Sequence, residues 1–395
     1  MSLPGPLSGV RLIEMSAIGP VPFAGMLFAD LGADVIRVDR PTDRPPRDAP
    51  AAASSACDDS AATLITRRGR RSIVLDLKTE AGRSVLMELV KRADILLEGG
   101  RPGVMERLSI GPDDCLAVNA RLVYGRATGW GQDGPYAHYA AHDINFLALT
   151  GALWAIGRPD ERPTPPLNLL GDYGGGGMYL AFGALCALLE ARNSGTGQVV
   201  DAAIVDGVAS MSALHWEMRA RGLTRDQRGS NLLDTGAPFY DVYECADGKF
   251  IALGAVEPRF FAEFCMAAGI PVDRFMRDRL RHAPKEQWPE LKQAIADLIA
   301  TRTQDEWCQS LEFTDACFAP VLSWTEAVDH PHNVARTVFE EVDGVVQPAP
   351  APRFSRTPGQ IRPSALPGAD TEQILAECGF TTEDIRTLHA QGGLG

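Results

Sequence analysis

The first 130 residues alternate between short apolar runs and segments whose apolar residues have helical spacing. The runs GVRLIEM (9–15) and DVIRVDR (34–40) have the composition of buried strands, and a loop and a helix are expected between them. Further strands are expected at RSIVLDLK (71–78), ADILLEG (93–99) and RLVYGRAT (121–128). Strands that alternate with helices favour a parallel sheet with helices on both faces, so we predict a doubly wound α/β fold.

The pattern changes in the second half of the chain. Residues 177–193 have a strongly apolar helical pattern, and residues 197–222 have that of a strand followed by a long helix. Two β-rich runs surround an Asp-Gly pair within 240–255, which predicts a hairpin. Helical patterns then follow at 258–269, 285–301 and 303–312. This change predicts a second, smaller α+β domain over residues 225–330.

The charge balance excludes one class of partner. The chain has 38 Lys and Arg against 51 Asp and Glu, a formal net charge of −13, which argues against nucleic-acid binding. Basic residues nevertheless gather in the N-terminal third, as in RRGRRS (67–72). This clustering fits a site for a small polyanion such as a nucleotide, and it fits an ordinary solvated surface equally well.

The sequence carries no membrane or secretory signal that we can identify. It has no run of 18 uncharged apolar residues, and its N-terminus lacks a basic region followed by an apolar stretch. The eight cysteines are scattered without a CxxC pair, which is typical of reduced thiols. We therefore expect a cytoplasmic protein without a membrane span, a metal site or a disulfide framework.

A charged pair stands at one predicted helix start. In AHDINFLALTG (141–151), His142 and Asp143 precede an apolar run. Phe146 and Leu149 of that run are expected on the buried side of the helix. The pair fits a helix cap, and it also fits a base held at a helix terminus. From the residues alone, a capping or packing role is favoured.

A glycine-rich stretch precedes the strongly apolar helix. LLGDYGGGG (169–177) has four successive glycines, which permit a tight turn or a close approach to a neighbouring element. Asp172, just before them, fits an N-cap or a carboxylate presented by a crowded backbone. The chain lacks GxGxxG in its first strand–helix loop, a Walker A lysine after these glycines, HExxH and GxSxG. Dinucleotide redox, P-loop, metalloprotease and serine-hydrolase functions are therefore unsupported.

Several stretches together resemble one family. They are PLSGVRLIEMSAIGPVPFAGMLFADLGADVIRVDRP, LLEGGRPGVMERL, ATGWGQDGPYAHYAAHDINFLALTG, PPLNLLGDYGGGG, GQVVDAAIVDG and YECADGKFIALGAVEPRFF. In this order, and over almost the whole chain, they are similar to the family III CoA-transferase superfamily. Within it they most resemble the branch that racemises 2-methylacyl-CoA thioesters.

The resemblance implies a division of the chain and an assembly. It implies a Rossmann-like large domain that binds CoA (1–200), a linker helix (201–224), a small domain (225–330) and a C-terminal segment (331–395) that returns to the large domain. Two chains are expected to interlock as a homodimer. Each active site would lie between the large domain of one chain and the small domain of the other.

The resemblance also implies a racemase or epimerase that acts on branched fatty acyl or sterol side-chain CoA thioesters. Removing the α-proton from one face and returning it to the other needs two acid/base groups, for which the family positions are His142 and Asp172. Glu257 would hold the imidazole and Asn168 the carboxyl group. The backbone N–H of Asp143 would donate to the enolate oxygen. Because no electrons move, no cofactor is expected besides the CoA moiety of the substrate.

One alternative stays open within the same superfamily. Its transferases use an aspartate nucleophile that forms an aspartyl-CoA thioester, and Asp172 falls at the nucleophile position. The racemases instead carry HDIN at the helix start and a Glu-Pro pair in place of a mobile glycine-rich loop. His142 and Glu257 match these two features, so the racemase is favoured.

Family positions that contact CoA are matched by Arg40, Leu75, Leu77, Lys78 and Arg107. Guanidinium groups suit phosphate oxygens. Arg70 and Arg71 are weaker candidates, and some of these cations could instead pair with nearby acids. The segment 41–66, rich in Pro, Ala, Ser and Asp, is expected to be a surface loop beside the nucleotide.

Overall fold

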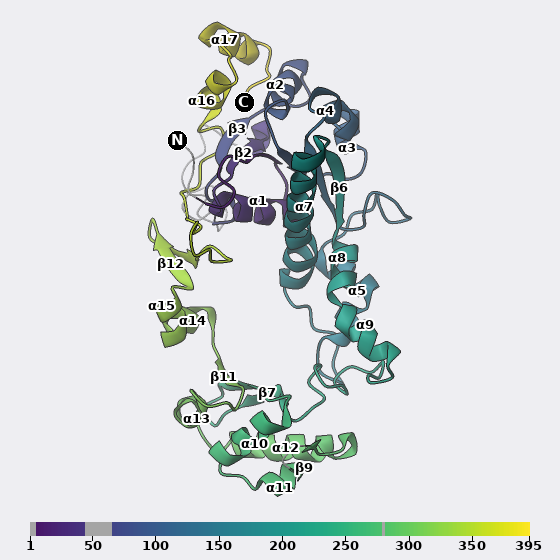
Figure 1. Cartoon of the computed structure of the whole chain (residues 1–395), viewed down its shortest axis with the longest axis vertical. Coiled ribbons are helices and arrows are strands. Elements are labelled where there is room, and N and C mark those ends of the chain that lie inside the picture. Colours follow the sequence, from purple (N-terminus) through teal and green to yellow (C-terminus); the bar gives the residue numbers. More distant parts are fainter. Residues whose placement is uncertain (1–4, 44–64, 279–280) are drawn as a thin grey trace. The chain divides into compact units, whose positions relative to one another are not determined.

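Figure 1 shows the computed structural model of the chain, which describes residues 5–43, 65–278 and 281–395. Most of the expected surface loop at 41–66 lies outside the described residues. The chain forms two compact units. The large unit contains residues up to 149, residues 167–211 and residues 337–395, and the small unit contains residues 150–166 and 212–336.

The large unit is built on a parallel sheet of six strands with the order β3-β2-β1-β4-β5-β6. The strands are β1 (Arg11–Met15), β2 (Asp34–Asp39), β3 (Arg71–Val74), β4 (Ile95–Glu98), β5 (Val123–Thr128) and β6 (Gln198–Ala203). The first five lie within the five runs predicted as strands, and the parallel α/β sheet is confirmed. Strand order reverses between β1 and β4, and ligands bind outside the carboxyl ends of the strands at such a point.

Helices cover both faces of this sheet. Successive strand residues point to opposite faces, so Leu12 packs in a core with α1 and α7, whereas Ile13 packs in a second core with α2, α4 and the C-terminal α16 and α17. The helices of the large unit are α1 (Pro20–Asp30), α2 (Glu80–Val90), α3 (Val104–Arg107), α4 (Pro112–Val118), α5 (Asp143–Thr150), η4 (Leu169–Met178), α7 (Tyr179–Ser194), α8 (Ile204–Met211), α16 (Thr371–Glu377) and α17 (Thr382–Ala390). A short hairpin, β12 (Phe339–Val342) and β13 (Val345–Pro348), precedes the last two.

The small unit contains the predicted hairpin. Strands β7 (Tyr240–Glu244) and β8 (Phe250–Gly254) pair antiparallel, and β11 (Phe318–Val321) completes the sheet. Its helices and further strands are α6 (Ala152–Ala155), α9 (Ala213–Ala220), α10 (Pro258–Ala267), α11 (Val272–Phe275), β9 (Met276–Asp278), β10 (Arg281–His282), α12 (Trp288–Ile299), α13 (Gln304–Leu311), α14 (Trp324–Asp329) and α15 (Pro331–Arg336). The long helix predicted after β6 is divided at Ser212 into α8 and α9.

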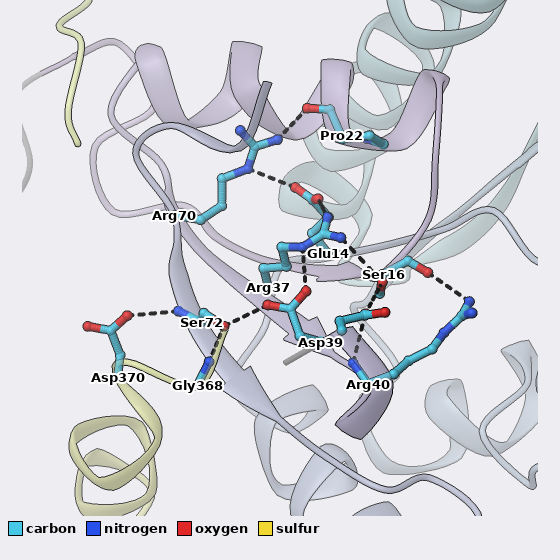
Figure 2. Close-up of polar contacts among 11 residues, drawn as sticks. Glu14, Ser16, Pro22, Arg37, Asp39, Arg40, Arg70, Ser72, Gly368 and Asp370 are labelled. Carbon is cyan, nitrogen blue, oxygen red and sulfur yellow. Dashed lines mark hydrogen bonds and ion pairs between the residues drawn. The ribbon is translucent and has the colours of Figure 1, made fainter. Parts of the chain in front are cut away.

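A buried ionic network joins the first three strands (Figure 2). The Glu14 carboxylate on β1 is fully buried and accepts hydrogen bonds from Arg37 of β2 and from Arg70, whose Nε lies 2.9 Å away. Arg37 also donates to Asp39 at 2.8 Å, and Asp39 accepts from the Ser72 hydroxyl at 2.6 Å. Buried charges are tolerated only when they are paired in this way, so the network fixes how β1, β2 and β3 lie together.

One apolar stretch raises the question of a membrane span. Among the described helices, Leu169–Ser194 is long and apolar enough to cross a membrane by length and composition alone. Half of its most apolar window is buried inside the fold, and α7 within it packs on β5 and β6. Because a core helix passes the same test, this stretch is weak support for a membrane span.

Breaking the buried network should destabilise the large unit. In Glu14→Leu, the Arg70 guanidinium stays buried without its carboxylate partner, so the free energy of unfolding should fall by about 3–5 kcal/mol. Denaturant unfolding followed by circular dichroism measures this loss. The control Arg11→Met removes a partly exposed pair with Asp34 and should cost no more than about 1 kcal/mol. An equally small loss for Glu14→Leu would contradict the structural role of the network.

Candidate active site

A cavity of about 310 Å³ lies where β1, β4 and β5 end, at the point where strand order reverses. Three of its walls are the segments that follow or end these strands: residues 18–21, 99–102 and 127–130. His142 and Asp172 also line it. The sheet therefore brings together two side chains that are 30 positions apart in the sequence, and both were predicted to carry the chemistry.

His142 stands directly before α5. Its backbone N–H donates to the Asn145 side-chain oxygen at 3.1 Å, and its carbonyl accepts from the Asn145 N–H at 2.8 Å. This reciprocal turn fixes the helix start, and the imidazole is left exposed at the cavity. The helix buries Phe146, but Leu149 is 59% exposed. The prediction that Leu149 is buried is therefore wrong for this chain taken alone.

Asp172 lies in η4, a wide helical turn that the glycine run makes possible. A Cβ on Gly175 would lie 2.9 Å from the backbone nitrogen of Val208 on α8, and one on Gly177 would lie 3.0 Å from the carbonyl of Pro20 on α1. Side chains at these positions would push η4 away from both neighbours. The glycines therefore act by close approach, and this approach holds Asp172 at the cavity.

The environment of the Asp172 carboxyl group favours its protonated form. Burial is the main cause that raises its pKa, and the negative charge of Asp143 raises it further. A hydrogen bond with the Asn168 side chain and the charge of His142 act in the opposite direction. Gly19 packs directly against the Asp172 carboxyl group, because a Cβ on Gly19 would lie 3.1 Å from one of its oxygens.

Asp143 makes a contact that the sequence did not indicate. Its carboxylate accepts the backbone N–H of Asp172 at 2.6 Å and also that of Gly171. The expected role of Asp143 concerned its own backbone N–H, which is at the first position of α5 and has no acceptor within the helix. The side chain therefore joins the start of α5 to η4.

A second ionic group supports the loop after β4. Glu98 is buried at the end of β4 and accepts the Gly100 N–H at 2.5 Å and the Arg126 guanidinium at 2.9 Å. Arg126 also bonds Glu106 of α3 at 2.7 Å. Arg101 of this loop lines the cavity, and sequence reasoning did not select it. The sequence feature that could have identified Arg101 is its position directly after a predicted parallel strand.

The five expected CoA contacts lie apart from the cavity lining. Arg40 is exposed at the end of β2, and its guanidinium donates to the Ser16 carbonyl at 3.1 Å. Lys78 and Arg107 are exposed and make no ion pair with the described residues. Leu77 is partly buried at the edge of the core, whereas Leu75 is only 1% exposed. Leu75 is therefore buried as a whole residue, and its backbone N–H donates to the Asp39 carbonyl.

Two weaker phosphate candidates are engaged by acids instead. Arg70 is buried and bonds Glu14 and the Pro22 carbonyl. Arg71 forms ion pairs with Asp34 at 2.8 Å and with Glu377 at 2.9 Å. The sequence could not reveal these partners, because they come from distant parts of the chain. Both arginines therefore have structural roles.

Glu257 belongs to the small unit, whereas His142 and Asp172 belong to the large unit. It is the exposed N-cap residue of α10, with extended backbone angles. Its expected role beside the imidazole stays a prediction. Among the described residues, no group of three or more His, Cys, Asp or Glu side chains has an arrangement that could hold a metal ion.

The fold and this cavity define a doubly wound α/β protein with a cavity at the point where strand order reverses. The chain belongs to CoA-transferase family III, whose family model matches residues 7–372. It is similar to the alpha-methylacyl-CoA racemase of Mus musculus, with 43% identity over 97% of this chain and 96% of that protein. The same identity and coverage hold for the alpha-methylacyl-CoA racemase of Homo sapiens. The crystal structure of Rv3272 from Mycobacterium tuberculosis is similar with a TM-score of 0.75 and 26% identity, covering 94% of this chain and 100% of that one.

Proposed function

We propose that this protein is an isomerase that inverts the α-carbon of 2-methylacyl-CoA thioesters, with branched fatty acyl or sterol side chains as acyl groups. The observation that carries the proposal is that one cavity is lined by both a histidine and a carboxyl group, His142 and Asp172. The 43% identity to racemases over nearly the whole chain supports the same reaction. The reaction moves a proton and no electrons, so the CoA moiety of the substrate is the only cofactor component proposed.

The proposed mechanism is proton transfer through an enolate. Neutral His142 removes the α-proton from one face, and protonated Asp172 returns a proton to the other face; the reverse direction exchanges these roles. Burial raises the pKa of Asp172, which suits a carboxyl group that must begin as an acid. Asn168 holds this group in position through its hydrogen bond.

The enolate oxygen needs hydrogen-bond donors as negative charge develops on it. The backbone N–H of Asp143 is at the first position of α5, and helix starts carry partial positive charge. One donor of this kind contributes about 3 kcal/mol to a transition state. Asp143 would therefore donate its backbone N–H to the enolate oxygen, beside the base His142.

CoA binding is proposed for the exposed cations near the carboxyl edge of the sheet. Arg40 follows β2, Lys78 follows β3 and Arg107 ends α3. Charged side chains without an acidic partner are free to bind phosphate oxygens, and arginine does so with a fork of donors. Arg101 adds a cation at the cavity itself. Leu77, which is partly exposed beside the buried Leu75, would border the nucleotide.

An interlocked homodimer is proposed because α7 leaves apolar side chains exposed. Met178 precedes this helix, and Phe182 and Leu189 lie on it, with exposed fractions of 49%, 67% and 65%. Large exposed apolar groups mark interaction sites. In such a dimer the partner subunit's Glu257 would hold His142. Light scattering should give twice the chain mass, and Phe182→Asp should lower it; a monomeric wild type would contradict the proposal.

A cytoplasmic location is proposed from cysteine usage. The cysteines in the described part of the chain are free thiols, which fits a reducing compartment. Oxidation-state labelling of the thiols in cells tests this location. Extensive disulfide formation there would contradict it.

A CoA-transferase is the second candidate, because the carboxyl group of Asp172 lies at the cavity of a family III member. In that reaction the Asp172 carboxylate would attack the acyl thioester and expel CoA thiolate, which leaves a mixed anhydride at Asp172. The thiolate would then attack the Asp172 carbonyl, release the acyl group as its carboxylate and leave an aspartyl-CoA thioester. Mass spectrometry of the enzyme after incubation with acyl-CoA distinguishes the two candidates. CoA attached at Asp172, with CoA transfer to a free carboxylic acid, would favour the transferase.

Removing either acid/base group should abolish most of the racemase activity. His142→Ala and Asp172→Ala should each lower kcat by about 10²–10⁴, the usual contribution of a positioned acid or base. Chiral chromatography of the product thioester measures the rate of inversion. The control His138→Ala removes an exposed histidine that does not line the cavity and should keep full activity. A loss of only a few-fold in both test variants would mean that the bases are assigned wrongly.

The CoA contacts can be tested by binding. Arg107→Ala should weaken the affinity for free CoA by about 10- to 100-fold, as expected when a hydrogen bond to a charged group is lost. Isothermal titration calorimetry measures the dissociation constant. Arg71→Ala serves as the control because Asp34 and Glu377 already engage this arginine; its affinity should stay within about twofold. Equal losses in the two variants would contradict the assignment.

A further inference from the structure

We infer that the Asp143 carboxylate is a positioning residue for Asp172: it holds the chain at Asp172 through two backbone N–H groups and places a negative charge beside the Asp172 carboxyl group. This inference rests on the proposed function for its consequence in catalysis. It goes beyond the expected role of Asp143, which concerned only the backbone N–H.

The contact between α5 and η4 is a short hydrogen bond between a side chain and the backbone. The Asp143 Oδ1 atom accepts the Asp172 N–H at 2.6 Å, which is short for an N–H···O hydrogen bond. The Gly171 N–H donates to the same carboxylate. A Cβ on Gly171 would overlap this carboxylate, so only glycine allows so close an approach. This contact links α5, which begins directly after His142, to η4, which carries Asp172.

The two carboxyl groups have unequal surroundings. Burial raises the pKa of Asp143, and the two backbone N–H donors of Asp172 and Gly171 act against this rise. Burial and the negative charge of Asp143 raise the pKa of Asp172, whereas a side-chain hydrogen bond with Asn168 and the charge of His142 lower it. On the α1 side, Gly19 and Pro20 offer no charged group, and Pro20 has no N–H to donate. When two carboxyl groups interact, one proton resides on the less stabilised anion, which here is Asp172.

This arrangement serves a reaction that must run in both directions. One turnover converts neutral His142 and protonated Asp172 into protonated His142 and ionised Asp172. With the ordinary pKa values of these residue types, about 3.9 for Asp and about 6.5 for His, the form with a protonated histidine and an ionised aspartate would predominate strongly. Burial raises the pKa of Asp172, the negative charge at Asp143 raises it further, and the two forms are thereby brought closer in free energy.

Replacing Asp143 by Asn and by Ala separates position from charge. Asp143→Asn keeps an oxygen that accepts both N–H groups, so kcat at the optimum should stay within about tenfold of the wild type, the size of one neutral hydrogen-bond change. Without the negative neighbour the pKa of Asp172 falls. The acid limb of kcat/KM against pH should therefore move to lower pH. Asp143→Ala loses the acceptor as well, and its kcat should fall about 10- to 100-fold further.

Asp206→Asn is the matched control, because it removes the same charge from an exposed position on the neighbouring α8. Its acid limb should coincide with that of the wild type. An unmoved acid limb in Asp143→Asn would overturn the role of the charge. A kcat for Asp143→Ala equal to that of Asp143→Asn would overturn the positioning role.

A second readout separates this inference from the proposed function. Infrared difference spectra between each protein and its Asp172→Asn derivative follow the titration of the Asp172 carboxyl group without any substrate. The titration should lie at lower pH in the Asp143→Asn background than in the wild type. If the titration shifts but the wild type has no racemase activity, the proposed racemase function is rejected and the inference stands. If the two titrations are identical, the inference is rejected and the proposed function stands.

Discussion

Between β1 and β4 the parallel sheet changes the side on which successive strands are added, with β2 and β3 on one side of β1 and β4 to β6 on the other. The helix α1 that follows β1 and the helix α4 that follows β4 cover opposite faces of the sheet, so the carboxyl ends of these two strands open into a crevice. The cavity is lined by the segments at these ends. Because α5 and η4 both follow β5 along the chain, His142 and Asp172 can meet at the same edge.

Polar groups inside the large unit make this geometry rigid. Glu14 ties β1 to β2 and to Arg70, and Glu98 with Arg126 holds the loop after β4. Each group is costly to bury alone and is therefore paired. Asp143 extends the same principle to the cavity, where its carboxylate joins two helix starts. Rigid placement of an acid and a base is what an inversion without redox chemistry requires.

Periodicity and turn chemistry predicted the strands of the large unit and the β7–β8 hairpin, because these depend on local alternation and on an Asp-Gly turn. Contacts between distant segments left no such local signal. Arg70 and Arg71 could not be told from ligand-binding arginines, since their acidic partners lie on other elements. Leu149 has the apolar spacing of a buried helix face, but it is exposed in the folded chain, which local spacing does not reveal. The residues at the cavity were selected through family resemblance, and the carboxylate contact of Asp143 emerged only from the three-dimensional structure.

The central claim is that this chain inverts an α-carbon by proton exchange. Its most direct test is incubation of the wild-type protein with one pure epimer of a 2-methylacyl-CoA in deuterated water, without added cofactor. Mass spectrometry follows deuterium at the α-carbon while chiral chromatography follows the epimer ratio. The account predicts deuterium incorporation together with progress toward a mixture of both epimers. An unchanged epimer without α-deuterium would contradict it.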